Sequence, residues 1–183
     1  MTPRKTSFDV LGQLGALRRY ALSLVRSPDE AEDLVHDALV RAYEKQSTFH
    51  SGGNLRSWLM SILHNAHIDR IRRGRSRLAR ETAAAELAPE AMAAPQDLSV
   101  RLKQLEGAFF ALPEDQRAAL HLVAIEDLSY QEAADALGIP VGTLMSRVSR
   151  ARARLRAFED ETRRGASATP HLKLVGGSSD DNG

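Results

Sequence analysis

Five arginines and no acidic residue lie between Thr143 and Arg156. Guanidinium groups form paired hydrogen bonds with phosphate oxygens and with the major-groove edge of guanine, so a helix carrying them on one side is suited to bind duplex DNA. The apolar residues of this segment recur at helical spacing, which predicts one buried side. The opposite side offers Thr143, Ser146, Arg147, Arg150 and Arg154, with Met145 and Ser149 beside them.

The preceding residues predict a second helix and a tight turn. Ser129 and Glu132 have the spacing of a capping box, in which each side chain bonds a free backbone amide of the first turn. Gly138 lies where helices commonly end in a left-handed residue, and Pro140 prevents continuation. The pattern predicts a helix-turn-helix over residues 128–155; the alternative is a basic surface helix in an ordinary bundle. The apolar positions are Tyr130, Ala133, Ala134 and Leu137, then Leu144, Val148, Ala151 and Leu155.

Charge is segregated along the chain although the formal net charge is only +1. Seven arginines lie between residues 56 and 80, and Asp69 alone opposes them before residue 75. Residues 29–37 hold five acidic residues and no lysine or arginine. Two basic segments predict contact with polyanion at two places, and the acidic segment predicts a different partner, a protein.

Several kinds of chemistry find no support. The chain has no cysteine, so it has no disulfide, no thiolate metal site and no thiol redox chemistry. His64 and His67 are three residues apart on a predicted helix, but no acid or cysteine completes a set of metal ligands. No nucleophile–base pair or phosphate-binding loop stands out. We therefore expect neither an enzyme nor a cofactor.

The 183 residues suffice for one or two small domains. No long apolar run marks a signal peptide or a membrane-spanning segment. We expect a cytoplasmic protein without membrane insertion.

Three helices are predicted in the first 74 residues. Leucines at helical spacing mark the first, between Leu11 and Leu24. The second begins at residues 27–30 (SPDE), with a serine cap, proline in the first turn and acids at the positive end of the helix dipole. A glycine-broken loop over residues 47–54 leads to the third, which Asn54 can cap. The expected inward residues are Ala31, Leu34, Val35, Ala38 and Ala42 in the second helix, and Leu55, Trp58, Leu59, Ile62, Leu63 and Ala66 in the third.

The composition then changes. Residues 82–97 are rich in alanine, contain two prolines and lack aromatic residues, which is typical of a linker. A further helix is expected with Val100 or Leu102, Leu105, Ala108, Phe109 and Leu112 inward, and another from Pro113 that buries Ala118, Leu122 and Ile125 or close neighbours. Polar residues beyond Arg164 predict disorder. The predicted fold class is all-α: two small helical domains joined by a flexible linker, the second a helix-turn-helix domain.

Two separate signatures resemble those of the extracytoplasmic-function (group IV) sigma factors of bacterial RNA polymerase. Residues 29–43 (DEAEDLVHDALVRAY) and 55–73 (LRSWLMSILHNAHIDRIRR) are similar to region 2 of that family. Residues 112–117 (LPEDQR), followed by the helix-turn-helix and residues 146–155 (SRVSRARARL), are similar to region 4. The two signatures in this order, with a linker between them, are highly specific. The chain is thereby identified as a member of the sigma-70 family.

The resemblance implies a region 2-like domain over residues 10–74, a linker over 75–97, a region 4-like domain over 98–158 and a disordered tail over 159–183. It implies an alternative sigma factor that binds core RNA polymerase, recognises the −35 and −10 promoter elements and promotes initiation, in a stress or envelope response. The expected partners are core RNA polymerase, promoter DNA and an anti-sigma factor that clamps the two domains.

The resemblance also implies contact residues. The acidic helix corresponds to the surface that docks on the clamp helices of the polymerase large subunit, through Asp33, His36, Asp37, Val40 and Arg41; the alternative is a solvated charged face. The third helix and its preceding loop correspond to the element that opens the −10 region, through His50, Ser51, Gly52, Asn54, Asn65, Arg70, Arg72 and Arg73. The −35 contacts correspond to Thr143, Met145, Ser146, Arg147, Ser149 and Arg150.

Two positions carry qualifications. Many relatives have a basic residue where this chain has Met145, so one base contact differs. Trp58 could stack on a flipped base, but its spacing with Leu55, Leu59 and Ile62 favours a role in the core.

Two other functions stay open on sequence alone. A conventional helix-turn-helix regulator would bind palindromic DNA as a dimer and without core polymerase, which leaves the N-terminal domain without a role. A sigma mimic would titrate an anti-sigma factor and is expected to have a degraded recognition helix, unlike the arginine-bearing face found here.

Overall fold

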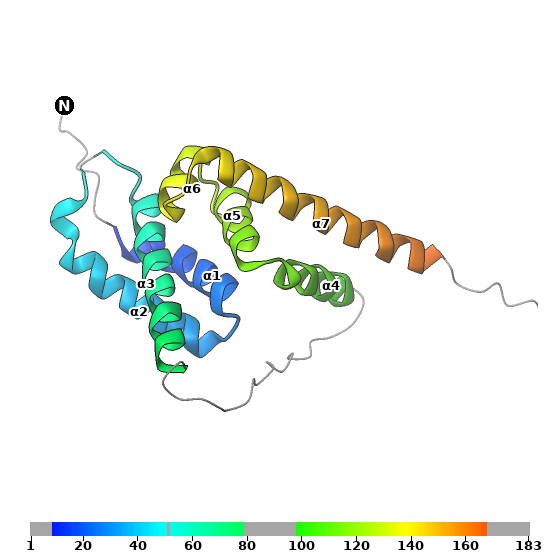
Figure 1. Ribbon diagram of the computed structural model, residues 1–183, viewed down its shortest axis with the longest axis horizontal. Helices are drawn as coiled ribbons and strands as arrows, with labels where there is room; N and C mark the ends of the chain where they lie inside the picture. Colours follow the sequence, from blue (N-terminus) through cyan, green and yellow to red (C-terminus); the bar gives the residue numbers. More distant parts are fainter. Residues whose placement is uncertain (1–8, 51, 79–97, 168–183) are drawn as a thin grey trace, which may run out of the picture.

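The protein, described by a computed structural model, is all-helical over residues 9–50, 52–78 and 98–167, which are the residues that the structure describes (Figure 1). No strand occurs within these ranges, which confirms the predicted fold class. The elements are the short 3₁₀ helix η1 (Leu11–Gln13), α1 (Leu14–Val25), α2 (Pro28–Glu44), the 3₁₀ helix η2 (Gln46–Thr48), α3 (Leu55–Leu78), α4 (Leu98–Ala111), α5 (Glu114–Ala124), α6 (Tyr130–Leu137) and α7 (Val141–Ser167).

The helix boundaries encoded by local capping chemistry form as predicted. The Ser27 hydroxyl accepts a hydrogen bond from the Glu30 amide, 3.4 Å away, at the start of α2. At α6 the capping box is complete: the Ser129 hydroxyl accepts from the Glu132 amide at 3.2 Å, and the Glu132 carboxylate accepts from the Ser129 amide at 2.8 Å. Gly138 ends α6 with a φ of 64°, a conformation that glycine adopts without steric cost.

The core of the first three helices follows the predicted pattern. Every expected inward residue of α2 is buried, as are Leu59, Ile62, Leu63 and Ala66 of α3. Leu55 and Trp58 are half-buried at the start of α3 and pack against this core. Met60 is fully buried although the helical stripe omitted it, because α3 is covered on a second side by other helices.

The apolar pattern is wrong at several positions of the second domain. Leu102 and Leu105 of α4 are 60% and 41% exposed, because α4 packs mainly against α7; Ala108 is buried, and the side chain of Val100, the alternative to Leu102, lies outside the described residues. Ile125 is 48% exposed, since the chain turns after α5 and points Glu126 inward instead. Tyr130, expected on the buried side of α6, is 37% exposed at the first residue of that helix.

Two helices run further than their apolar patterns. α3 continues to Leu78, past the expected end near Arg73, and α7 continues to Ser167, past Arg156 and into the tail predicted to begin at residue 159. Arginine, alanine and glutamate are good helix formers, which favours helix in these polar ends. Ser51, linker residues 79–97 and tail residues 168–183 lie outside the described residues.

The two helical units pack against each other, which the sequence does not predict. α6 lies along α3, and α5 lies along α1 (Figure 1). Tyr20 of α1 is fully buried at this junction, with its ring 5.3 Å from the ring of His121 of α5 and 6.4 Å from that of His64 of α3. The buried apolar residues form one continuous cluster that includes residues of both units.

Candidate nucleic-acid interface

The polar side of α2 is open to solvent. Asp33, His36 and Asp37 are exposed, and Val40 is 46% exposed; with Arg41 they recur every three or four residues and so share one face, called here the docking face. Arg41 is half-buried and donates to the Asp69 carboxylate of α3 at 2.7 Å. This hydrogen bond holds the pKa of Asp69 below its usual range and ties the docking face to α3.

The basic end of α3 lies beside α2. Arg72 and Arg73 are exposed, while half-buried Arg70 reaches the carbonyl oxygen of Glu30 at 3.4 Å. Asp37 and Gly74 join Arg70 and Arg73 around a surface hollow of ≈ 350 Å³. Asn65, also exposed, lies nearer the start of the helix. These residues form the basic half of the predicted −10 face, defined here as loop residues 50 and 52–54 together with Ser57, Asn65, Arg70, Arg72 and Arg73 of α3.

The loop half of the −10 face surrounds a pocket of ≈ 310 Å³. The rings of Phe49 and Trp58 lie 5.3 Å apart on its wall, so Trp58 is both packed on the core and accessible from the pocket. Asn54 caps α3 by accepting from the Ser57 amide at 3.3 Å. His50, Gly52 and Asn54 are exposed, and Gly52 has a φ of 105°, which favours glycine at this position.

The opposite wall of this pocket comes from the second domain. The side-chain amide of Asn54 donates to the Glu132 carboxylate of α6 at 2.7 Å. The Ser57 hydroxyl donates to the backbone carbonyl oxygen of Glu132 at 3.3 Å. The hydrogen bond from Asn54, with those from Ser129, lowers the pKa of Glu132. Asp135 and Ala136 of α6 complete the lining.

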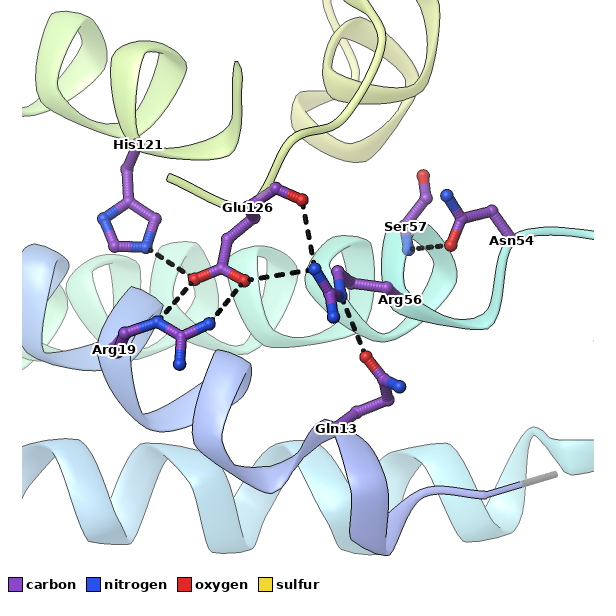
Figure 2. Close-up of polar contacts among 7 residues, drawn as sticks. All are labelled: Gln13, Arg19, Asn54, Arg56, Ser57, His121 and Glu126. Atoms are coloured by element: carbon purple, nitrogen blue, oxygen red, sulfur yellow. Dashed lines mark hydrogen bonds and ion pairs between the residues drawn. The ribbon is translucent and has the colours of Figure 1, made fainter. Parts of the chain in front are cut away.

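A buried ionic cluster, which the sequence did not predict, lies next to this contact (Figure 2). The Glu126 carboxylate has no exposed surface; Arg19 of α1 donates two hydrogen bonds to it, both at 3.0 Å, and Arg56 of α3 lies 3.8 Å away. Its fourth member is His121 of α5, with Nε2 at 3.3 Å. Burial raises the pKa of Glu126, but the hydrogen bonds from His121 and Arg19 outweigh it and hold the pKa below its ordinary value.

The predicted −35 residues lie on the outer side of α7. Met145 is 55% exposed and Ser149 and Arg150 are exposed, while Thr143 and Ser146 are half-buried. Arg147 is partly committed, because its guanidinium pairs with the Asp115 carboxylate of α5 at 3.2 Å. The structure therefore brings the predicted residues together on one helix but ties one of them to its own domain.

The histidines of α3 are engaged in contacts within the protein. No group of three histidine, cysteine or acidic side chains that could hold a metal occurs within the described residues. His64 lies 3.0 Å from the Tyr20 hydroxyl, and His67 lies 2.9 Å from the Glu114 carboxylate. None of the helices that the structure describes has the length and apolar character needed to span a membrane.

Comparison with known proteins identifies both domains. The family model for Sigma-70 region 2 matches residues 13–93, and that for Sigma-70, region 4 matches residues 102–155. The chain is 38% identical over 151 residues to the ECF RNA polymerase sigma factor EcfG of Rhodopseudomonas palustris (strain TIE-1), covering 82% of each chain. It is 35% identical over 141 residues to the ECF RNA polymerase sigma factor SigM of Mycobacterium tuberculosis (strain H37Rv), covering 76% of this chain and 69% of that protein.

Two solved structures also match this chain. The sigma factor RpoE in complex with the anti-sigma factor NepR, from Bartonella quintana, matches with a TM-score of 0.71 at 39% identity, over 82% of this chain and 93% of that chain. CnrH in complex with the cytosolic domain of CnrY matches with a TM-score of 0.57 at 28% identity, over 83% and 85% of the two chains. The chain therefore belongs to the extracytoplasmic-function sigma factors of the sigma-70 family, and it is an alternative sigma factor that acts in transcription initiation.

Proposed function

We propose that this sigma factor docks on core RNA polymerase through the docking face of α2, captures the −10 element on the −10 face and reads the −35 element with the outer side of α7. The observation that carries the proposal is the exposure of a mixed acidic and apolar face on α2 next to the basic end of α3. Such an arrangement allows one domain to bind a protein surface and the DNA strand beside it.

The −10 face has the two components that single-strand capture needs. Arg72 and Arg73 supply cations for the backbone, and the pocket walled by Phe49 and Trp58 supplies aromatic surface for an unstacked base. Exposed polar groups at Asn54 and Asn65 add hydrogen-bonding capacity. These features support the assignment of the −10 contacts to this face.

On α7, Arg150 is the strongest candidate for base recognition. Its side chain is exposed and has no recorded carboxylate partner among the described residues, so it is available for a paired hydrogen bond with guanine. Met145, which is also exposed on α7, can offer only apolar contact. We therefore assign Arg150 to base discrimination and the arginines further along α7 to phosphate contacts.

The relatives support a regulatory setting for this activity. RpoE of Bartonella quintana is bound by the anti-sigma factor NepR in its solved structure, and the chain is 39% identical to that protein over the matched region. An anti-sigma factor of this kind, acting in the cytoplasm and released under stress, is the partner we assign to this chain. The protein has no catalytic role of its own in this scheme.

Run-off transcription with purified core polymerase on a genomic DNA library tests the proposed function. We expect the protein to direct core polymerase to discrete start sites that share two upstream elements. A conventional regulator would instead bind duplex DNA without core polymerase, and a sigma mimic would yield no transcripts. The absence of start sites, with no association between the protein and core polymerase, would overturn the proposal.

A further inference from the structure

We infer that Met145 recognises the C5 methyl group of a thymine in the upstream promoter element, which makes it a specificity-determining residue of α7. The inference rests on the proposed function, because it takes the outer side of α7 to be the surface that reads the −35 element. It goes further by naming the base and the group that are recognised. Met145 is 55% exposed and lies at the start of the second turn of α7, where the side chains of a helix-turn-helix reach base edges.

The buried side of α7 fixes the rotation of the helix about its own axis. Leu144, Val148 and Ala151 are at most 1% exposed and belong to the core that α7 shares with α5 and α6. Met145 follows Leu144 directly and so lies at one border of the outer side, with exposed Ser149 one turn further along the same border. Met145 therefore stays at the protein surface unless the whole helix rotates and its buried residues leave the core.

The polar neighbours of Met145 are committed to contacts within the chain. The Ser146 hydroxyl donates to the backbone carbonyl oxygen of Thr143 at 2.9 Å. The Arg147 guanidinium pairs with the Asp115 carboxylate of α5 at 3.2 Å. Ser146 and Arg147 are half-buried, so Met145 is the exposed side chain of the second turn, residues 145–148. Apolar contact is therefore the main interaction that this turn of α7 offers to a base edge.

The chemistry of a thioether favours one base among the four. In the major groove guanine, adenine and cytosine present hydrogen-bonding groups, whereas thymine also presents a methyl group. Methionine has no donor and only a weak acceptor, so it cannot replace the hydrogen bonds to water that a polar base edge loses on contact. Contact with a methyl group instead removes apolar surface from water on both partners. Met145 therefore favours thymine and disfavours the three other bases.

Helix geometry limits where this thymine can lie. The rise from Met145 to Arg150 along the axis of α7 is about 7.5 Å, at about 1.5 Å per residue. Successive base pairs are about 3.4 Å apart, so this rise corresponds to about two base-pair steps. We expect the thymine within about three base pairs of the pair whose recognition depends on Arg150. A preference for thymine elsewhere in the promoter would not arise from Met145.

Uracil substitution tests the inference with the holoenzyme formed from the full chain and core polymerase. The probe is a labelled promoter duplex obtained by run-off transcription, in which each thymine of the upstream element, on both strands, is replaced in turn by uracil. Uracil lacks only the C5 methyl group and keeps every hydrogen-bonding group of thymine. At one thymine we expect the wild type to lose affinity about threefold to fivefold, the effect of returning one methyl-sized apolar group to water.

Substitutions of Met145 assign the effect to its side chain. Met145→Ala should bind the thymine and uracil duplexes equally, whereas Met145→Leu, which keeps an apolar side chain of similar volume, should retain most of the preference. Met145→Lys should prefer guanine at that base pair, because lysine donates to guanine O6 and N7. Arg150→Ala is the matched comparison on the same helix: it should weaken binding through its own base pair but keep the wild-type ratio between thymine and uracil. Met145 and Arg150 are exposed, so these variants should fold, which circular dichroism verifies.

The outcomes separate the inference from the proposed function. Equal binding of every uracil duplex by the wild type overturns the inference, and so does a methyl preference that survives in Met145→Ala. An upstream element without thymine within about three base pairs of the Arg150-dependent pair also overturns it. Scrambling the whole upstream element in the same duplex tests the proposed function. If scrambling leaves holoenzyme binding unchanged, α7 does not read the −35 element and the proposed function fails. If scrambling weakens binding while uracil has no effect, only the inference fails.

Discussion

The docking face of α2 and the −10 face belong to the same small domain, but they differ in their contacts with the second domain. Asp33, His36 and Asp37 project into solvent, and no hydrogen bond or ion pair from the second domain to them is recorded among the described residues. Asn54 and Ser57 of the −10 face are instead bonded to Glu132 of α6. The docking face of α2 is therefore accessible to a partner, whereas part of the −10 face is already bound by α6.

This difference implies an order of events. In the proposed function, core polymerase engages the docking face without displacing the second domain, whereas DNA binding at Asn54 and Ser57 requires displacement of Glu132 of α6.

The largest expected effect concerns His64 of α3, which lies where the second domain covers the first and changes its protonation state with pH. Burial lowers the pKa of His64 to about 4, with further lowering from His67 and Arg147 and an opposing effect from Glu114; the Tyr20 hydroxyl lies 3.0 Å from its ring. The unfolded chain binds a proton below pH 6.5, but the folded chain does not until about pH 4. Stability should therefore decrease as the pH falls from 6.5 to 4, by roughly 3 kcal/mol in total and roughly 2 kcal/mol by pH 5.

Urea denaturation of the wild type and His64→Gln, each at pH 6.5 and pH 5, measures this effect. The loss between the two pH values should be smaller by roughly 2 kcal/mol in the variant. Restricting the comparison to pH 5 and above avoids the acidic groups whose lowered pKa values cause loss of stability only below 4.5, among them Glu114 and Glu126. An equal pH dependence in both proteins would contradict the assignment of His64 as a buried neutral residue.

The variant Asp37→Arg tests the exposed docking face of α2. Asp37 is exposed, so the variant should fold normally and retain the interdomain contacts. Charge reversal on a surface that meets a complementary partner should weaken core polymerase binding on the order of tenfold to a hundredfold. Fluorescence titration of labelled protein with core polymerase gives the affinity, and Glu161→Arg, at the exposed far end of α7, serves as the charge-matched control. Normal core affinity in Asp37→Arg would show that the docking face lies elsewhere.

Within α7, too, an exposed arginine can be compared with one that is paired inside its own domain. Arg150 is exposed, whereas Arg147 is bound to Asp115. Arg150→Ala should reduce discrimination between promoters at the upstream element by about 1–3 kcal/mol, the value of one paired base contact. Run-off transcription on a panel of upstream-element variants measures the ranking. Arg156→Ala is the control and should lower activity evenly across the panel; an unchanged ranking in Arg150→Ala removes that residue from the base contacts.

Local chemistry made much of this fold predictable. The serine caps at Ser27 and Ser129 and the glycine at 138 act within a few residues, so their patterns are visible in the sequence. The buried face of α2 was likewise predictable, because its five inward residues follow one helical period. The −10 and −35 candidates came from family resemblance, and their roles stay predictions.

The contacts between the domains were not predictable for a physical reason. Glu126 and Arg19 are 107 positions apart, and neither departs from the pattern of an ordinary surface residue. The turn after α5, where Asp127 has a φ of 55°, reverses the apolar pattern by exposing Ile125 and burying Glu126. Only the packing of one domain on the other assigns a buried role to Glu126, and no local rule contains that information.

The smallest expected effect compares two serine caps. Ser129 caps α6, the helix that covers the −10 face, and Ser27 caps α2, the helix of the docking face. Replacing either with alanine should lower the free energy of unfolding by about 1 kcal/mol, because each hydroxyl satisfies one free amide. The chain has no cysteine, so fluorescent labels on cysteines introduced at Leu11 and Glu161 report energy transfer between the domains. The two variants should differ in this energy transfer, since Ser129 also donates to the Glu132 carboxylate at 2.7 Å and helps hold it against Asn54.

Ser129→Ala should therefore lower energy transfer between the domains, and Ser27→Ala should not, at matched loss of stability in urea. That pairing separates closure from general stability, because both variants lose one cap but only one loses it on the covering helix. Equal energy transfer in the two variants would mean that α6 holds the −10 face independently of its first turn, with the Glu126 cluster and the apolar contacts sufficient to keep the domains together.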